Sequence, residues 1–121
     1  MEANVNELVG KILTKVVRNG DESLTFYCED GSVYSMYHDQ DCCESVEIDD
    51  LNGDLEDLVG SPVTYAEELT NVDEKGKGEY EDSYTWTFYK FATVKGWVDV
   101  KWYGCSNGYY SESVTFTKVK K

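Results

Sequence analysis

The chemically richest segment of the chain places its only histidine beside two thiols. Residues 37–44 read YHDQDCCE, so His38 lies within five positions of Cys42 and Cys43. Imidazole and thiolate groups are the usual ligands of structural zinc, and the same pair forms the base and nucleophile of thiol enzymes. The segment therefore raises a metal- or thiol-dependent enzyme as one hypothesis for this chain.

The spacing within this segment favours neither kind of site. Zinc fingers and ribbons draw their four ligands from two separated pairs, and catalytic triads are assembled from distant parts of a chain. Here the groups are contiguous, and no glycine-rich turn adjoins them to form an oxyanion hole. We therefore expect free thiols, a hydrogen-bonded His38, no metal, no cofactor and no catalysis, and we keep the enzyme as an alternative.

Carboxylates are the second chemical feature, and they gather in the middle of the chain. The net charge is −13, and residues 21–82 hold 20 acidic side chains against two basic ones. Such a field repels nucleic acid and anionic membranes and attracts basic protein surfaces, although charge runs also serve as solvated faces. The acids that we expect to contact a partner protein are Asp39, Asp41, Glu44, Glu47, Asp49, Asp50, Asp54 and Asp57.

Aromatic side chains offer a second kind of binding site. Some are expected opposite the core or in loops, where they could stack on a nucleobase, anchor a protein or simply pack in a second buried layer. These are Tyr84, Tyr89, Trp97, Tyr103, Tyr109 and Tyr110. An alternative hypothesis is therefore a small-ligand module that sequesters a nucleotide signal through His38, Trp102, Tyr109 and Tyr110.

The elements that must position these groups are mostly strands. Alternating apolar and polar residues, rich in β-branched and aromatic types, predict strands at 11–17, 23–29, 33–37, 45–49, 63–69, 84–94, 97–103 and 113–119. Asn-Gly at 19–20, Asp-Gly at 30–31 and Lys-Gly at 95–96 predict hairpin turns between neighbouring strands. Apolar residues at helical spacing predict a short helix over 51–59, and residues 4–9 predict a helical turn or an edge segment.

The expected core faces follow from the alternation. In strand 84–94 the residues predicted to share one face are Trp86, Phe88, Ala92 and Val94, and in strand 97–103 they are Val98, Val100 and Trp102. At 121 residues the chain fits one domain, 1–121. We expect a mainly β fold of the α+β class, with about eight strands in an antiparallel sheet, sandwich or partial barrel and one or two short helices.

Several strings of the sequence resemble a family of small, uncharacterised phage- and prophage-encoded proteins. The most specific is YHDQDCCESV at 37–46, followed by GDLEDLVGSP at 53–62, WTFYKFAT at 86–93 and WYG with SNGYYSE at 102–112. The resemblance runs from about Leu8 to Phe116 and implies a phage context. Small acidic accessory proteins of phages often inhibit host machinery by occupying a nucleic-acid groove or by sequestering a nucleotide.

The leading hypothesis combines this context with the charge. It is a non-enzymatic, phage-encoded protein that inhibits a host defence or nucleic-acid-handling protein through a surface that mimics nucleic acid. The expected partner is a host protein with a basic surface, with no direct nucleic acid and no membrane, and exposed aromatic strands would also suit a homodimer. With no secretory-type N-terminus and no long apolar run, we expect the protein in the cytoplasm of the host cell.

Overall fold

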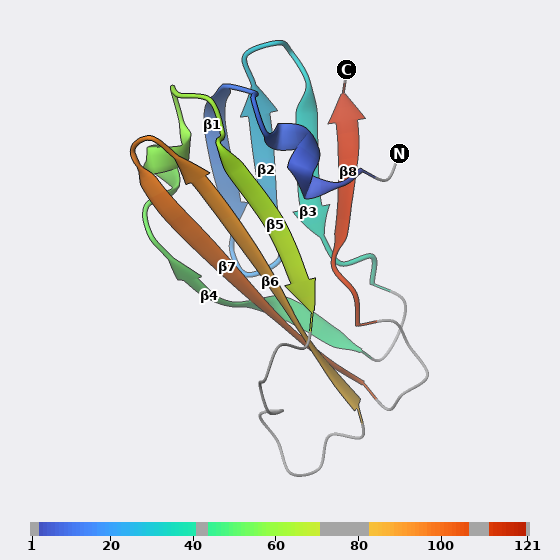
Figure 1. Cartoon of the computed structure of the whole chain (residues 1–121). Coiled ribbons are helices and arrows are strands. Elements are labelled where there is room, and N and C mark those ends of the chain that lie inside the picture. The colour runs from blue at the N-terminus through green and yellow to red at the C-terminus, as the bar shows by residue number, and fades with distance from the viewer. Residues whose placement is uncertain (1–2, 41–43, 71–82, 107–111, 121) are drawn as a thin grey trace.

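The computed structural model describes residues 3–40, 44–70, 83–106 and 112–120, and these form a β sandwich of two four-stranded antiparallel sheets (Figure 1). The first sheet has the order β1-β2-β3-β8, with β1 at Leu13–Asn19, β2 at Ser23–Cys28, β3 at Val33–Tyr37 and β8 at Thr115–Lys120. The second has the order β4-β7-β6-β5, with β4 at Ser45–Asn52, β5 at Tyr65–Thr70, β6 at Ser83–Thr93 and β7 at Gly96–Ser106.

Tight turns build the first sheet as a meander. The predicted Asn-Gly and Asp-Gly turns are confirmed, because Gly20 and Gly31 adopt positive φ angles of 57° and 93° between β1, β2 and β3. Glycine reaches this region without the steric cost that a Cβ atom imposes. The chain then crosses to β4 and returns to the first sheet only with β8, as Figure 1 shows.

The core lies between the two sheets. Phe26 of the first sheet packs against Phe91 of the second, with ring centroids 5.5 Å apart, and against Phe116 at 6.0 Å. Trp102 is 1% exposed, and its indole Nε1 donates to the Met36 sulfur at 3.3 Å. Apolar side chains therefore join the sheets on their inner faces.

Two 3₁₀ turns, rather than α-helices, accompany the strands. They are η1 at Val5–Leu8 and η2 at Leu55–Leu58, and their side chains Leu8 and Leu58 are fully buried. The helix predicted over 51–59 is wrong in extent: β4 continues to Asn52, and only one turn follows. The chain reverses at Gly53, whose φ is +102° and whose missing Cβ would lie 2.4 Å from the Trp97 carbonyl oxygen.

The eight predicted strands are confirmed, including the weakly patterned one at β5, but the predicted core face of β6 is wrong. Tyr89 and Phe91 are the residues that join the core cluster, and Trp86 and Phe88 face the opposite side of the sheet. The physical reason is that β6 carries aromatic residues on both faces, so alternation alone could not tell them apart.

Among the described residues, no helix has the length and apolar character needed to cross a membrane.

Candidate functional site

The outer face of the second sheet carries the densest arrangement of polar and aromatic groups among the described residues. Successive side chains of a strand point to opposite faces, so the residues between the core positions of β6 and β7 face outward. The strand register aligns these outward residues in rows across the sheet. One row consists of Glu67, Lys90, Asp99 and Asn52, and the next consists of Leu69, Phe88, Lys101 and Asp50.

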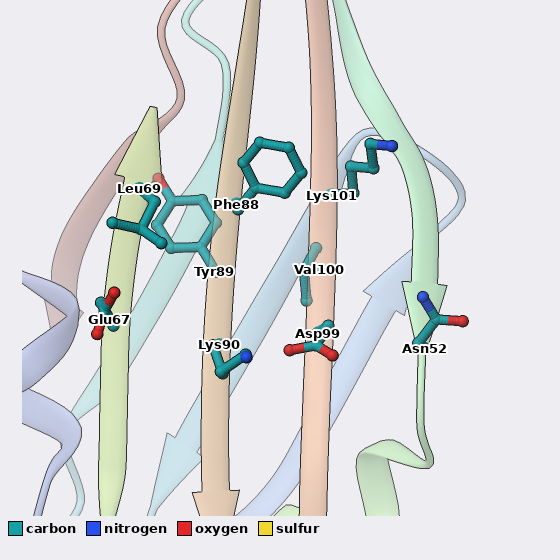
Figure 2. A pocket seen from close by; sticks show the side chains of 9 residues that line it. All are labelled: Asn52, Glu67, Leu69, Phe88, Tyr89, Lys90, Asp99, Val100 and Lys101. Atoms are coloured by element: carbon teal, nitrogen blue, oxygen red, sulfur yellow. The ribbon is translucent and has the colours of Figure 1, made fainter. Parts of the chain in front are cut away.

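A hollow of about 350 Å³ lies over these two rows (Figure 2). Its side walls come from four strands, with Leu69 of β5, Phe88 of β6, Lys101 of β7 and Asn52 of β4 around it. Leu69 is 46% exposed, so one wall presents an apolar surface to solvent. We call this feature the outer-face hollow.

The charges in the outer-face hollow are held apart from one another. Lys90 is the register partner of Asp99, yet no ion pair joins them; the Lys90 ammonium lies over the Trp97 ring, 5.6 Å from its centroid. The Lys101 ammonium lies 4.4 Å from the centroid of the Trp86 ring. Aromatic faces attract cations, so these rings draw the lysines toward the two ends of the hollow.

Asp99 is the electrostatically unusual member. Its Oδ1 atom is buried and accepts no hydrogen bond from any residue that the structure describes. A buried carboxylate oxygen without a donor destabilises the fold, because it has lost its hydration without replacement. Because this atom has almost no solvent-exposed surface, a donor from outside the chain could reach it only after the neighbouring side chains move aside.

A second feature is an acidic edge formed by β4 and η2. Strand β4 is at one margin of its sheet, and the exposed acids there and in the following turn are Glu47, Asp50, Asp54 and Glu56, which we call the β4 acidic edge. None of these four forms an ion pair with a described residue. The backbone N–H of Ile48 donates to the Asp21 carbonyl at 2.8 Å, which fastens β4 to the β1–β2 turn.

Two acids of this edge also organise their own backbone. The Asp50 carboxylate accepts from the Leu51 N–H at 2.9 Å, and the Asp54 carboxylate caps η2 by accepting from the Glu56 N–H at 3.0 Å. Such short-range caps fix side-chain direction at little entropic cost. Glu47 and Glu56 make no such bond in the described part of the chain, so they are the cleanest positions at which to change charge.

The other acids expected to contact a partner are spread over different environments. Asp39 is exposed, Asp49 is half-buried at the β4 bulge, and Asp57 is half-buried against Gly96. Glu44 is buried away from the β4 acidic edge, and Asp41 lies outside the described residues. The structure therefore brings together only part of the predicted acidic surface.

Glu44 instead forms a buried pair with His38. The His38 Nε2 atom lies 2.7 Å from the Glu44 carboxylate, and the two side chains are 4% and 0% exposed. The His38 Nδ1 atom lies 2.7 Å from the Ser113 carbonyl oxygen, which can only accept, so Nδ1 carries a hydrogen. The His38–Glu44 pair joins the segment after β3 to the start of β4, and the His38–Ser113 hydrogen bond joins it to the segment before β8, so both have the character of structural bonds.

A protein-family comparison can be set beside this geometry. A family model described as a domain of unknown function, DUF7448, matches residues 6–116, which is nearly the whole chain. The chain belongs to the DUF7448 family. No curated protein and no solved structure matches it.

The remaining predicted residues divide between the core of this DUF7448 domain and segments outside the description. Trp102 is enclosed between the sheets, so its ring has no surface for a ligand. Tyr109, Tyr110, Cys42 and Cys43 lie outside the described residues. Within the described ranges, no three acidic, histidine or cysteine side chains gather as a metal-binding group.

The hollow of the DUF7448 domain was not predicted from the sequence. Its polar members come from β4, β5, β6 and β7, and they meet only through the register of three strand pairs. The one usable signal was the β6–β7 hairpin, because a tight turn fixes which residues face each other across it.

Proposed function

We propose that this DUF7448 domain is a non-catalytic binding protein that docks on a basic surface of a partner protein through the β4 acidic edge. The observation that carries the proposal is the row of exposed acids, Glu47, Asp50, Asp54 and Glu56, which lack ion-pair partners among the described residues. Unpaired charge of one sign speeds encounter with an oppositely charged surface and selects against like-charged ones.

The resemblance to phage-encoded proteins supports a narrower form of the proposal. In it, the partner is a host defence or nucleic-acid-handling protein, met in the host cytoplasm, and binding blocks the cleft that normally holds nucleic acid. A carboxylate row can stand in for phosphates there, because both present negative charge to lysine and arginine side chains. Catalysis has no part in the proposal.

The first experiment identifies the partner. The tagged domain is expressed in a bacterial host, purified at low salt and examined by native mass spectrometry. We expect a basic protein that is released as the salt concentration rises and that loses its nucleic acid when this domain binds. A complex that retains nucleic acid, or a partner with an acidic surface, would contradict the proposal.

The second experiment tests the surface itself with matched variants. Glu47→Gln with Glu56→Gln removes two charges from the β4 acidic edge, and Glu29→Gln with Glu68→Gln removes two exposed charges elsewhere. We expect the edge variant to bind the partner about tenfold or more weakly, mainly through a slower association rate, and the control to change less than about twofold. Equal weakening by both variants would mean that net charge, rather than this edge, attracts the partner.

A further inference from the structure

The outer-face hollow has the dimensions and composition of a small-ligand site. Its volume of about 350 Å³ falls within the range of roughly 300–1,000 Å³ that is common for such pockets. Leu69 and Phe88 supply apolar walls, and Glu67, Lys90 and Asp99 place charged groups around them (Figure 2). This combination of apolar surface with a few convergent polar groups is typical of ligand pockets.

The acceptor side of the hollow requires N–H or O–H donors. Asp99 Oδ1 is buried without a donor in the described part of the chain, and Lys90 lies over an aromatic ring instead of pairing with it. Once the side chains that cover Oδ1 move aside, two adjacent N–H groups on one edge of a ligand would satisfy both carboxylate oxygens, as a bidentate pair. Hydrogen bonds to a charged acceptor are also stronger than neutral ones.

The donor side of the hollow requires an acceptor on the same ligand. Lys101 follows Asp99 by two positions on the same face of β7, and Lys90 is opposite Asp99 on β6. Cross-strand neighbours on one face lie about 5 Å apart at Cβ, within reach of one small ring system. A carbonyl oxygen beside the paired donors would accept from one of these ammonium groups.

The walls favour a flat and uncharged ligand. The Phe88 ring offers a stacking surface, and stacking is available to any planar heterocycle. The net charge of −13 opposes a polyanionic ligand, and the two lysines oppose a compact cation. A neutral ring with a donor–donor–acceptor edge meets all of these conditions.

We propose that the outer-face hollow binds a free, planar heterocycle that presents two adjacent N–H donors next to a carbonyl, the edge found on guanine. Asp99 accepts the two N–H groups, Lys90 or Lys101 donates to the carbonyl, and Phe88 with Leu69 packs against the ring. None of the four acids of the β4 acidic edge lines this hollow, and its ligand is a small molecule instead of a protein.

The test compares three nucleosides that differ only at this edge. Guanosine, inosine and adenosine are titrated to about 2 mM into the full chain, and amide chemical shifts are followed by NMR. We expect guanosine to shift the amides of β6 and β7 around Lys90 and Asp99 with a Kd below about 1 mM. Inosine, which lacks the second N–H donor, should bind about tenfold or more weakly, and adenosine should not bind.

Variants separate recognition by Asp99 from adventitious contact. Asp99→Asn should weaken guanosine about tenfold or more, Lys90→Met should weaken it severalfold, and the exposed control Asp39→Asn should leave it unchanged. An absence of shifts with guanosine, equal shifts with adenosine, or unchanged binding by both hollow variants would overturn the proposal. Shifts produced by a guanine-containing oligonucleotide but not by guanosine would also overturn it, because the ligand would then be nucleic acid. None of these outcomes affects the test of the β4 acidic edge.

Discussion

Replacing His38 by leucine should destabilise the domain strongly, because it leaves the Glu44 carboxylate buried without its imidazole partner. The two side chains are 4% and 0% exposed, and their contact distance is 2.7 Å. The same substitution removes the donor to the Ser113 carbonyl, also at 2.7 Å. Removing one member of a buried pair costs about 3–5 kcal/mol when it leaves a charge behind. Since domains of this size unfold with about 5–15 kcal/mol, the variant would lose between about a fifth and all of its stability.

Urea denaturation followed by circular dichroism measures this loss directly. At about 4 °C per kcal/mol, the melting temperature should also fall by about 12–20 °C. Adding Glu44→Gln to His38→Leu removes the buried acidic group and should restore part of the loss, so the two substitutions should be strongly non-additive. The neighbouring exposed Asp39→Asn should change the unfolding free energy by less than about 0.5 kcal/mol. A loss below about 1 kcal/mol for His38→Leu would refute the structural role of this pair.

Three further predictions test other parts of the fold. The Lys11 ammonium holds the pKa of the Asp30 carboxyl well below its usual range. The pair therefore stabilises the fold above about pH 4 and loses this effect as the pH falls further. In a curve of unfolding free energy against pH, Asp30→Asn should make the fall in stability toward low pH shallower. Burial raises the pKa of Tyr89 far above its usual range. Above about pH 10 this tyrosine therefore ionises in the unfolded chain first, and the stability of the fold decreases. In urea titrations Tyr89→Phe should reduce this loss at alkaline pH and change the stability at pH 7 by less than about 1.5 kcal/mol. Gly53→Ala, which combines a φ of +102° with a backbone clash, should cost about 3 kcal/mol or more by denaturation, whereas Gly20→Ala, with open space around it, should cost about 1–2 kcal/mol.

Alternation and turn signals in the sequence predicted the β fold closely, but they failed where the outcome depends on packing between the two sheets. The face of β6 could not be assigned, because Trp86 and Phe88 are as apolar as Tyr89 and Phe91. Only packing against the first sheet determines which pair lies between the sheets, and that depends on residues more than 50 positions away, such as Phe26.

The candidate site shows the same limit through strand register. A turn at Lys95–Gly96, as predicted, pairs Val94 with Trp97 and would set Lys90 opposite Lys101. In the structure the turn is one residue earlier, Thr93 pairs with Gly96, and Lys90 faces Asp99. A one-residue error in a hairpin turn therefore moves every cross-strand partner by two positions. The predicted turn would place two lysines opposite each other, whereas the observed turn places a lysine opposite an aspartate.

The acids of β4 could also protect an exposed strand edge, and the acids in the turn after the strand distinguish this role from partner binding. Charged side chains on an edge strand discourage edge-to-edge pairing with another copy, and Glu47 and Asp50 would serve this purpose. Edge protection needs no charge beyond the last residue of the ladder. The exposed acids nevertheless continue through Asp54, the N-cap of η2, and Glu56 within η2, where no strand is available to pair. Glu56→Gln should therefore weaken partner binding without promoting self-association, whereas a chain in which the acids act only against aggregation would show no change in binding.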